Sequence, residues 1–211
     1  MLLVLSACRA PSGAPTEPGA TQTREAGEAF ALWPEETPAE ARAAAERLAL
    51  GEDPWRSDPR ETALAFASSV LGWETAVAGS PTEQAGGLTT VAIRREPGGP
   101  EVSVRLLRCV DGRWWCVYNA WGGLEHDPSL SVHGHRMELR FAMQDAASAL
   151  VVVEYGDLRL QRAVERERAV RFDLETAPRE PGYFLLLLRD AQGRVFGVAS
   201  SPLPAGDFAA G

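Results

Sequence analysis

The spacing of hydrophobic residues changes near residue 89. Before that point apolar residues recur every three or four positions, as in Ala63, Phe66 and Val70, which is the period of an amphipathic helix. Beyond it, apolar and polar residues alternate through segments such as Glu101–Cys109, which is the period of a strand with one buried face. The pattern predicts an α+β N-terminal part followed by a part built of strands.

Two segments share one helix-start signal. Thr37-Pro38-Ala39-Glu40 and Asp58-Pro59-Arg60-Glu61 each place a capping residue before a proline at the first helical position and a glutamate at the third. We expect one helix over 38–50, ending at Gly51, and a second helix from 59 to the glycine at Gly72.

Three strands are expected next, at 89–94, 101–109 and 114–120. Two helices followed by an antiparallel meander form a small α+β domain with the helices on one sheet face, which we place at residues 30–123. Trp33, Trp55 and Trp73 flank the helices, and we expect them to cover the edges of this core. Exposed stacking against a sugar is the alternative role for these tryptophans.

The segment Trp121-Gly122-Gly123-Leu124 interrupts the alternation and marks a domain boundary. Seven short strands are expected beyond it, at 129–133, 137–143, 149–155, 158–164, 169–174, 183–189 and 195–199. Two of these strands have charged outward residues: Glu138 and Arg140 in one, Arg171 and Asp173 in another. This number and spacing of strands is typical of an all-β immunoglobulin-like sandwich, which we place at residues 124–205, before a short tail at 206–211.

Cys109 and Cys116 lie on one predicted β-hairpin. A type I′ turn at Asp111-Gly112 would place Cys109 opposite Trp114, with Cys116 diagonally on the same face; a type II′ turn at Gly112-Arg113 would place the cysteines opposite each other. In an oxidising compartment we expect a structural disulfide. A redox-active or metal-binding pair is the alternative, which the spacing does not favour.

Residues 1–8 read MLLVLSAC, and Leu5-Ser6-Ala7-Cys8 resembles the lipobox of bacterial lipoproteins. The resemblance implies a lipid anchor on Cys8 and an extracytoplasmic location. Residues 9–29 are rich in Pro, Gly, Ala, Thr and Glu, and we expect them to form a disordered tether. Because a secretory signal begins with positive charge and has a longer apolar core, we expect residues 1–8 to be a truncated signal whose start codon lies upstream. A chance match in a cytosolic protein is the alternative.

Composition limits the classes of partner. The formal net charge is −8, and the sequence contains no lysine, so every residue counted as Lys or Arg is arginine. An acidic chain without a basic stripe is not expected to bind nucleic acid, nor to attach to anionic lipid by a polybasic segment. No stretch approaches the roughly 20 apolar residues of a membrane-spanning helix.

Several short motifs resemble those of actinobacterial envelope lipoproteins: Trp33-Pro34, then Pro54-Trp55-Arg56 followed by Asp58-Pro59, then Leu71-Gly72-Trp73 at the end of a helix. The C-terminal half is similar to the immunoglobulin-like modules of the spore-germination-associated type. The resemblance covers most of the chain and implies an envelope role, with no catalytic residue to carry over.

All three histidines lie in Glu125-His126-Asp127 and His133-Gly134-His135. On a strand, His133 and His135 point to the same side, and His126 would complete a three-ligand site that suits zinc. The alternative is a polar connector whose histidines face water.

Two further features of the sequence each allow more than one interpretation. The charged run 159–171 is either an interaction face or the solvated side of strands and their turn. Trp114, Trp115 and Tyr118 would line a ligand pocket if convergent polar groups accompanied them. The motifs of nucleophilic, phosphate-binding and metalloprotease chemistry are absent from the sequence.

We therefore expect a non-catalytic binding or accessory module of the cell envelope, without a cofactor. It would be anchored to the membrane through Cys8 and bind an envelope protein or a cell-wall component that the sequence does not identify. A metal-binding envelope protein or enzyme using His126, His133 and His135 is one alternative, and a small-ligand carrier is another.

Overall fold

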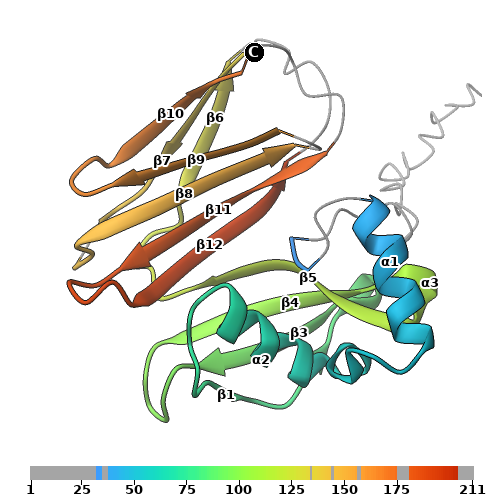
Figure 1. Ribbon diagram of the computed structural model, residues 1–211. Coiled ribbons are helices and arrows are strands. Elements are labelled where there is room, and N and C mark those ends of the chain that lie inside the picture. Colours follow the sequence, from blue (N-terminus) through green and yellow to red (C-terminus); the bar gives the residue numbers. More distant parts are fainter. Residues whose placement is uncertain are drawn as a thin grey trace, which may run out of the picture.

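The computed structural model describes residues 32–34, 38–133, 135–143, 145–155, 158–174 and 181–203. These residues form two antiparallel sheets, of nine and three strands, with two short α-helices against one end of the larger sheet (Figure 1). The predictions for Cys8, the tether at 9–29, Thr37 and the tail at 206–211 lie outside the described residues. None of the helices in the described part is long and apolar enough to cross a bilayer.

The helices begin where the sequence predicts. α1 spans Pro38–Ala49 and α2 spans Pro59–Ser69. The Asp58 side chain accepts hydrogen bonds from the backbone N–H groups of Arg60 at 2.7 Å and Glu61 at 3.2 Å, which confirms the predicted cap of α2. A short 3-10 helix between them, η2 (Pro54–Ser57), was not predicted.

The larger sheet has the strand order β1-β3-β4-β5-β12-β11-β8-β9, with β2 beside β3. Its strands are β1 (Val77–Ala78), β2 (Thr82–Glu83), β3 (Thr89–Arg94), β4 (Glu101–Cys109), β5 (Trp114–Gly122), β8 (Ser148–Tyr155), β9 (Leu158–Val164), β11 (Gly182–Arg189) and β12 (Val195–Leu203). The short helical turns are η3 (Ala85–Gly87), before β3, and α3 (Val110–Arg113), between β4 and β5. The smaller sheet has the order β10-β7-β6, formed by β6 (Ser129–His133), β7 (Arg136–Arg140) and β10 (Ala169–Asp173).

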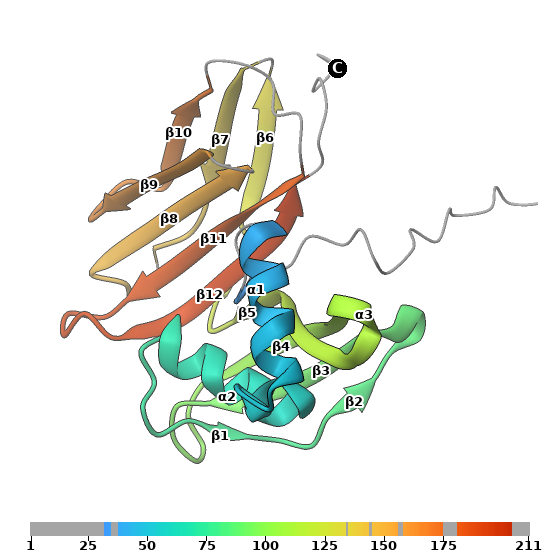
Figure 2. The same cartoon turned by 45° about the vertical axis from the view of Figure 1, so that its right-hand side comes forward.

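The main difference from the predicted strands lies where β5 meets β12. β5 runs two residues further than its alternation predicts, and there it pairs with β12 through Val198 opposite Gly122 and Ala199 opposite Trp121. β12 also runs further than predicted, to Leu203, because it pairs with β11 along that length. The larger sheet therefore continues across residue 123, where the sequence places a domain boundary. Figures 1 and 2 show β12 and β11 following β5 in one twisted sheet.

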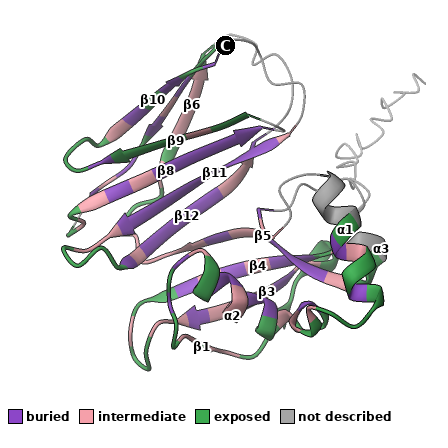
Figure 3. Ribbon diagram, in the orientation of Figure 1, coloured by how far each residue is buried: buried purple, intermediate pink, exposed green. Residues whose placement is uncertain are grey.

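Two hydrophobic cores lie on opposite faces of this sheet. In β11, Tyr183, Leu185 and Leu187 join the first core, which contains Phe66 of α2. The alternate residues Phe184, Leu186 and Leu188 of β11 join the second core, between the two sheets. β11 is buried along almost its whole length (Figure 3), as its unbroken apolar sequence predicts for a central strand. The part that follows residue 123 is thus a β-sandwich.

Candidate functional site

The outer face of the smaller sheet carries a group of charged side chains beneath a shallow hollow. In β7, Met137 and Leu139 are fully buried in the second core, so Glu138 and Arg140 point outward. In the neighbouring strand β10, Arg171 lies directly opposite Glu138. The alternation that buries these strands therefore places a carboxylate and two guanidinium groups side by side.

Glu138 binds Arg140 and Arg171, each through the Nε atom of the guanidinium group. Its carboxylate accepts a hydrogen bond from Arg140 Nε at 2.5 Å and another from Arg171 Nε at 2.6 Å. The Glu138 side chain is only 13% exposed, whereas those of Arg140 and Arg171 are 67% and 63% exposed. The hydrogen bond from Arg171, followed by that from Arg140, lowers the pKa of the Glu138 carboxyl, so it stays ionised at neutral pH.

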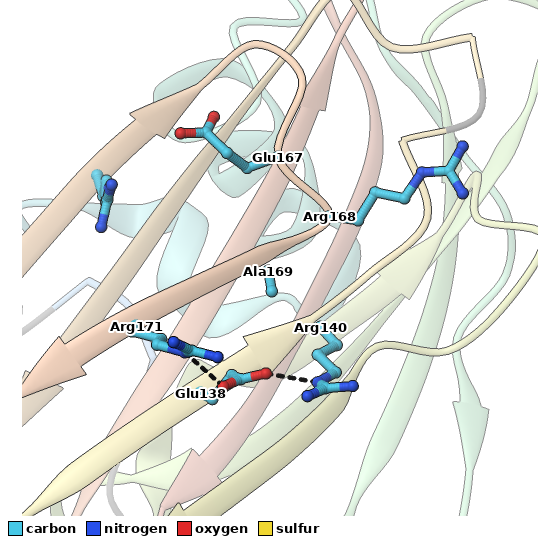
Figure 4. A pocket seen from close by; sticks show the side chains of 7 residues that line it. Glu138, Arg140, Glu167, Arg168, Ala169 and Arg171 are labelled. Atoms are coloured by element: carbon cyan, nitrogen blue, oxygen red, sulfur yellow. Dashed lines mark hydrogen bonds and ion pairs between the residues drawn. The ribbon is translucent and has the colours of Figure 1, made fainter.

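A shallow hollow of about 580 Å³ lies over this group. We call its arginines the arginine surface: Arg140 of β7, Arg162 of β9, Arg168 just before β10, and Arg171 of β10. Glu138, Glu167 and Ala169 complete the lining, and Figure 4 shows Glu138 between Arg140 and Arg171. The site thus combines the outer face of the smaller sheet with β9, the edge strand of the larger one.

The arginine surface has unused hydrogen-bond donors. Arg140 and Arg171 contact Glu138 through Nε, and among the described residues their Nη groups have no partner. The side chains of Arg162 and Arg168 have no hydrogen bond or ion pair with any described residue. Four arginines against two glutamates give the lining a local formal charge of +2 in a chain of −8. Guanidinium groups in such an arrangement bind carboxylate or phosphate oxygens.

A second hollow of about 500 Å³ adjoins the first and contains two of the three histidines. His133 and His135 line it together with Arg136, Glu138, Arg171 and Asp173. Arg136 Nε donates to Asp173 at 2.8 Å, and this hydrogen bond raises the pKa of the guanidinium. His126 lies in the β5–β6 connection and does not line this hollow. Within the described residues, no three His, Cys, Asp or Glu side chains are grouped so that they can hold a metal ion.

The two cysteines form a disulfide, with a Cα–Cα distance of 6.0 Å. Cys109 pairs with Trp114 in the β4–β5 register, and Cys116 pairs with Leu107, so the cysteines are diagonal neighbours. This is the pairing of the first predicted register. The connection differs from a two-residue turn, because residues 110–113 form the helical turn α3.

The tryptophans predicted to cover the first core lie at its edge or inside it. Trp73 is buried and donates from Nε1 to the Val195 carbonyl of β12 at 2.8 Å. The ring centroid of Trp33 lies 5.2 Å from that of Trp55 and 6.0 Å from that of Phe66. Trp115 is buried, and the Cζ atom of the Arg108 guanidinium lies 4.3 Å from the centroid of its ring. Trp33, Trp73 and Trp115 thus pack in or against the first core.

No family model matches the chain, and no curated protein is significantly similar to it. The sequence predicts an interaction face or a solvated surface at 159–171, and it predicts that Glu138 and Arg140 point outward. It does not bring these two segments together. The pairing of β7 with β10 and the position of β9 beside them assemble the arginine surface from three strands.

Proposed function

We propose that this protein is a lipid-anchored extracytoplasmic binding module that recognises an anionic polymer of the bacterial cell envelope through the arginine surface. The observation that carries the proposal is the set of four outward arginines with unused donors, in a chain whose net charge is −8. A strongly acidic protein repels polyanions in general, so a local cluster of guanidinium groups gives attraction only at that surface. The ligand groups are phosphate or carboxylate oxygens, spaced along a chain.

Glu138 makes the site more selective than a flexible cationic patch. Its carboxylate fixes the Nε side of two neighbouring guanidinium groups and leaves their Nη sides toward the hollow. Two oriented guanidinium groups favour a ligand oxyanion that accepts from both, and less side-chain entropy is lost on binding. This arrangement supports recognition of one anionic group at a defined place, followed by further contacts with Arg162 and Arg168.

The disulfide supports the extracytoplasmic location. Such bonds persist in oxidising compartments and are rare in reducing ones. The lipid anchor itself rests on the resemblance of Leu5-Ser6-Ala7-Cys8 to a lipobox. A diacylglycerol carries two acyl chains, which is enough for stable attachment to a membrane.

Strand topology supports an immunoglobulin-like classification of the sandwich. Counting from β6, the first, second and fifth strands form the smaller sheet, and the third, fourth, sixth and seventh lie in the larger one. The constant-type immunoglobulin arrangement differs only in the fourth strand, which there joins the first, second and fifth. In this chain the fourth strand, β9, pairs with β8 instead.

A binding measurement with matched charge changes tests the proposed recognition. The full chain, with Cys8→Ala to prevent lipidation, is titrated with poly(glycerol phosphate), poly-L-glutamate and neutral dextran at several salt concentrations. We expect salt-dependent binding to one or both anionic polymers, none to dextran, and at least about tenfold weaker binding for Arg140→Gln/Arg171→Gln.

The control variant Arg60→Gln/Arg113→Gln makes the same change in net charge at exposed residues of α2 and α3. It should bind like the unmodified protein. Equal weakening of both double variants would show that total charge, rather than the arginine surface, governs binding, and an absence of binding to either polyanion would refute the proposed ligand class.

A further inference from the structure

Arg56 places a buried positive charge against the disulfide. Its side chain belongs to η2 and is only 1% exposed. The Nη2 atom lies 3.4 Å from Cys116 Sγ and 3.6 Å from Cys109 Sγ. The guanidinium therefore contacts both sulfur atoms.

Local contacts fix Arg56 in this position. η2 begins after Asp53, whose carboxylate accepts from Trp55 Nε1 at 3.3 Å. The Thr62 hydroxyl of α2 donates to the Trp55 carbonyl at 3.1 Å, and the Arg56 guanidinium lies 5.8 Å from the centroid of the Trp55 ring. The sequence Asp53-Pro54-Trp55-Arg56 thus directs the guanidinium onto the β4–β5 hairpin.

The two sulfurs differ in their surroundings. Cys116 is buried, at 1% exposure, whereas Cys109 is half-buried at the end of β4. A sulfur in a disulfide is a weak hydrogen-bond acceptor, but a thiolate carries a full negative charge and is stabilised strongly by an adjacent guanidinium. Arg56 therefore interacts more favourably with the reduced pair, once Cys116 is a thiolate, than with the disulfide.

We propose that Cys109–Cys116 is a redox-active disulfide, and that Arg56 stabilises its reduced form by holding the Cys116 thiolate. This activity goes beyond the proposed binding of an anionic polymer and does not depend on it. The partner class is a dithiol reductant, and its assignment to the envelope rests on the proposed extracytoplasmic location.

The exchange proceeds in two steps. A thiolate of the reductant attacks the more exposed Cys109 Sγ, the S–S bond breaks, and its electron pair leaves on Cys116 Sγ as a thiolate beside Arg56. The second thiolate of the reductant then attacks its own sulfur in the mixed disulfide and releases Cys109, which takes up a proton. The protein gains two electrons, and the reductant becomes a disulfide.

Other charged groups lie on the elements that pack around this hairpin end. The described ones are Glu46 and Arg47 of α1, Glu52 and Asp53 before η2, Asp58, Arg60 and Glu61 at the start of α2, Arg108 of β4 and Arg113 of α3. Asp53 binds Arg47 as well as Trp55, and Asp58 caps α2. Arg108 stacks on Trp115 and donates to the Arg113 carbonyl. These groups are present in every variant below, so the comparisons isolate the contribution of Arg56.

The first test measures the equilibrium between disulfide and dithiol in dithiothreitol redox buffers. The full chain is used, with Cys8→Ala so that only Cys109 and Cys116 react. Arg56→Met removes the charge and keeps a long side chain, and Arg56→Lys keeps the charge. We expect at least a tenfold lower equilibrium constant for reduction in Arg56→Met, equivalent to about 30 mV, with a smaller loss in Arg56→Lys. An unchanged constant in a folded Arg56→Met variant would overturn the proposal.

A second test leaves Arg56 in place, because its substitution in the core can unfold the protein. Cys109→Ser and Cys116→Ser, each with Cys8→Ala, leave one thiol, whose ionisation is followed by thiolate absorbance near 240 nm. The expected result is a Cys116 thiol with a pKa below the ordinary value of about 8.5 and below that of Cys109. A Cys116 thiol that titrates at or above the ordinary value would show that Arg56 does not stabilise the thiolate.

Discussion

Ala199 lies directly opposite Trp121 where β12 pairs with β5, and this contact makes the nine strands one sheet. The two residues that follow Trp121, Gly122 and Gly123, have no room for a side chain. A Cβ atom on Gly123 would lie 2.0 Å from the Phe196 carbonyl oxygen and 2.9 Å from the Gly197 Cα. Gly123 thus lets the exit of β5 approach the backbone of β12 closely, whereas Gly122 lies against the backbone of β4 at Glu101 and Val102.

Substitution of Gly123 is therefore expected to destabilise the whole protein. Gly123→Ala introduces a backbone clash as well as an unfavourable positive φ of 67°. We predict a loss of about 2–4 kcal/mol in the free energy of unfolding, measured by urea denaturation. Gly193→Ala is the control, because its φ is also positive, at 76°, but no atom lies within 4 Å of the added Cβ. A loss of only about 1 kcal/mol is expected there, and equal losses would contradict the role assigned to the β5–β12 contact.

The shared sheet also predicts cooperative unfolding. All six tryptophans lie before residue 122, so tryptophan fluorescence reports on the first half, whereas far-ultraviolet circular dichroism reports on all strands. Because Val152, Leu185 and Leu187 of the second half belong to the first core, both signals should change at the same urea concentration. Two separated transitions would indicate two independent domains on either side of residue 123.

Local patterns predicted most elements, because each element is determined by its own residues. The cap at Asp58, the alternation in β4 and the unbroken apolar run of β11 gave their positions correctly. The junction between β5 and β12 depends on pairing between residues almost 80 positions apart, and Trp121-Gly122-Gly123-Leu124 reads locally as an interruption. The arginine surface was missed as a unit for the same reason, since Glu138 and Arg171 meet only when β7 pairs with β10. The residues around Arg56 in the sequence did not indicate its contact with the cysteines, which lie 53 and 60 positions away.

Tyr155 predicts a pH dependence at alkaline pH. Burial raises the pKa of its hydroxyl to about 12, against about 10 in the unfolded chain. Between these values the unfolded chain releases the proton and the folded protein keeps it, so the free energy of unfolding falls by up to about 1.4 kcal/mol per pH unit. Below pH 10 the Tyr155 hydroxyl is neutral in both states, so it does not make the free energy of unfolding depend on pH there.

Tyr155→Phe should remove this part of the decline. Below pH 10 the substitution should cost little or even stabilise the protein, because the buried hydroxyl has no hydrogen-bond partner among the described residues. Denaturation curves from pH 8 to 11.5 provide the comparison. If the variant and the unmodified protein lose stability in parallel, Tyr155 is not the group responsible.

The cap of α2 gives a prediction with a conservative control. Asp58→Ala leaves two backbone N–H groups of the first turn without their side-chain acceptor, and we expect a loss of about 1 kcal/mol in the free energy of unfolding. Asp58→Asn keeps an oxygen acceptor and should lose much less. An alanine variant as stable as the asparagine variant would argue against the cap.

We propose above that an extracytoplasmic binding module is attached to the membrane through Cys8. The most direct measurement is the intact mass of the mature protein, expressed from its native gene in a Gram-positive host and compared with Cys8→Ala. We expect a chain that begins at Cys8, carries a diacylglycerol-sized addition and is found in the membrane fraction, with the addition lost in the variant. An unmodified chain that begins at Met1 and stays in the cytosol would contradict the anchor, the location and the envelope ligand together.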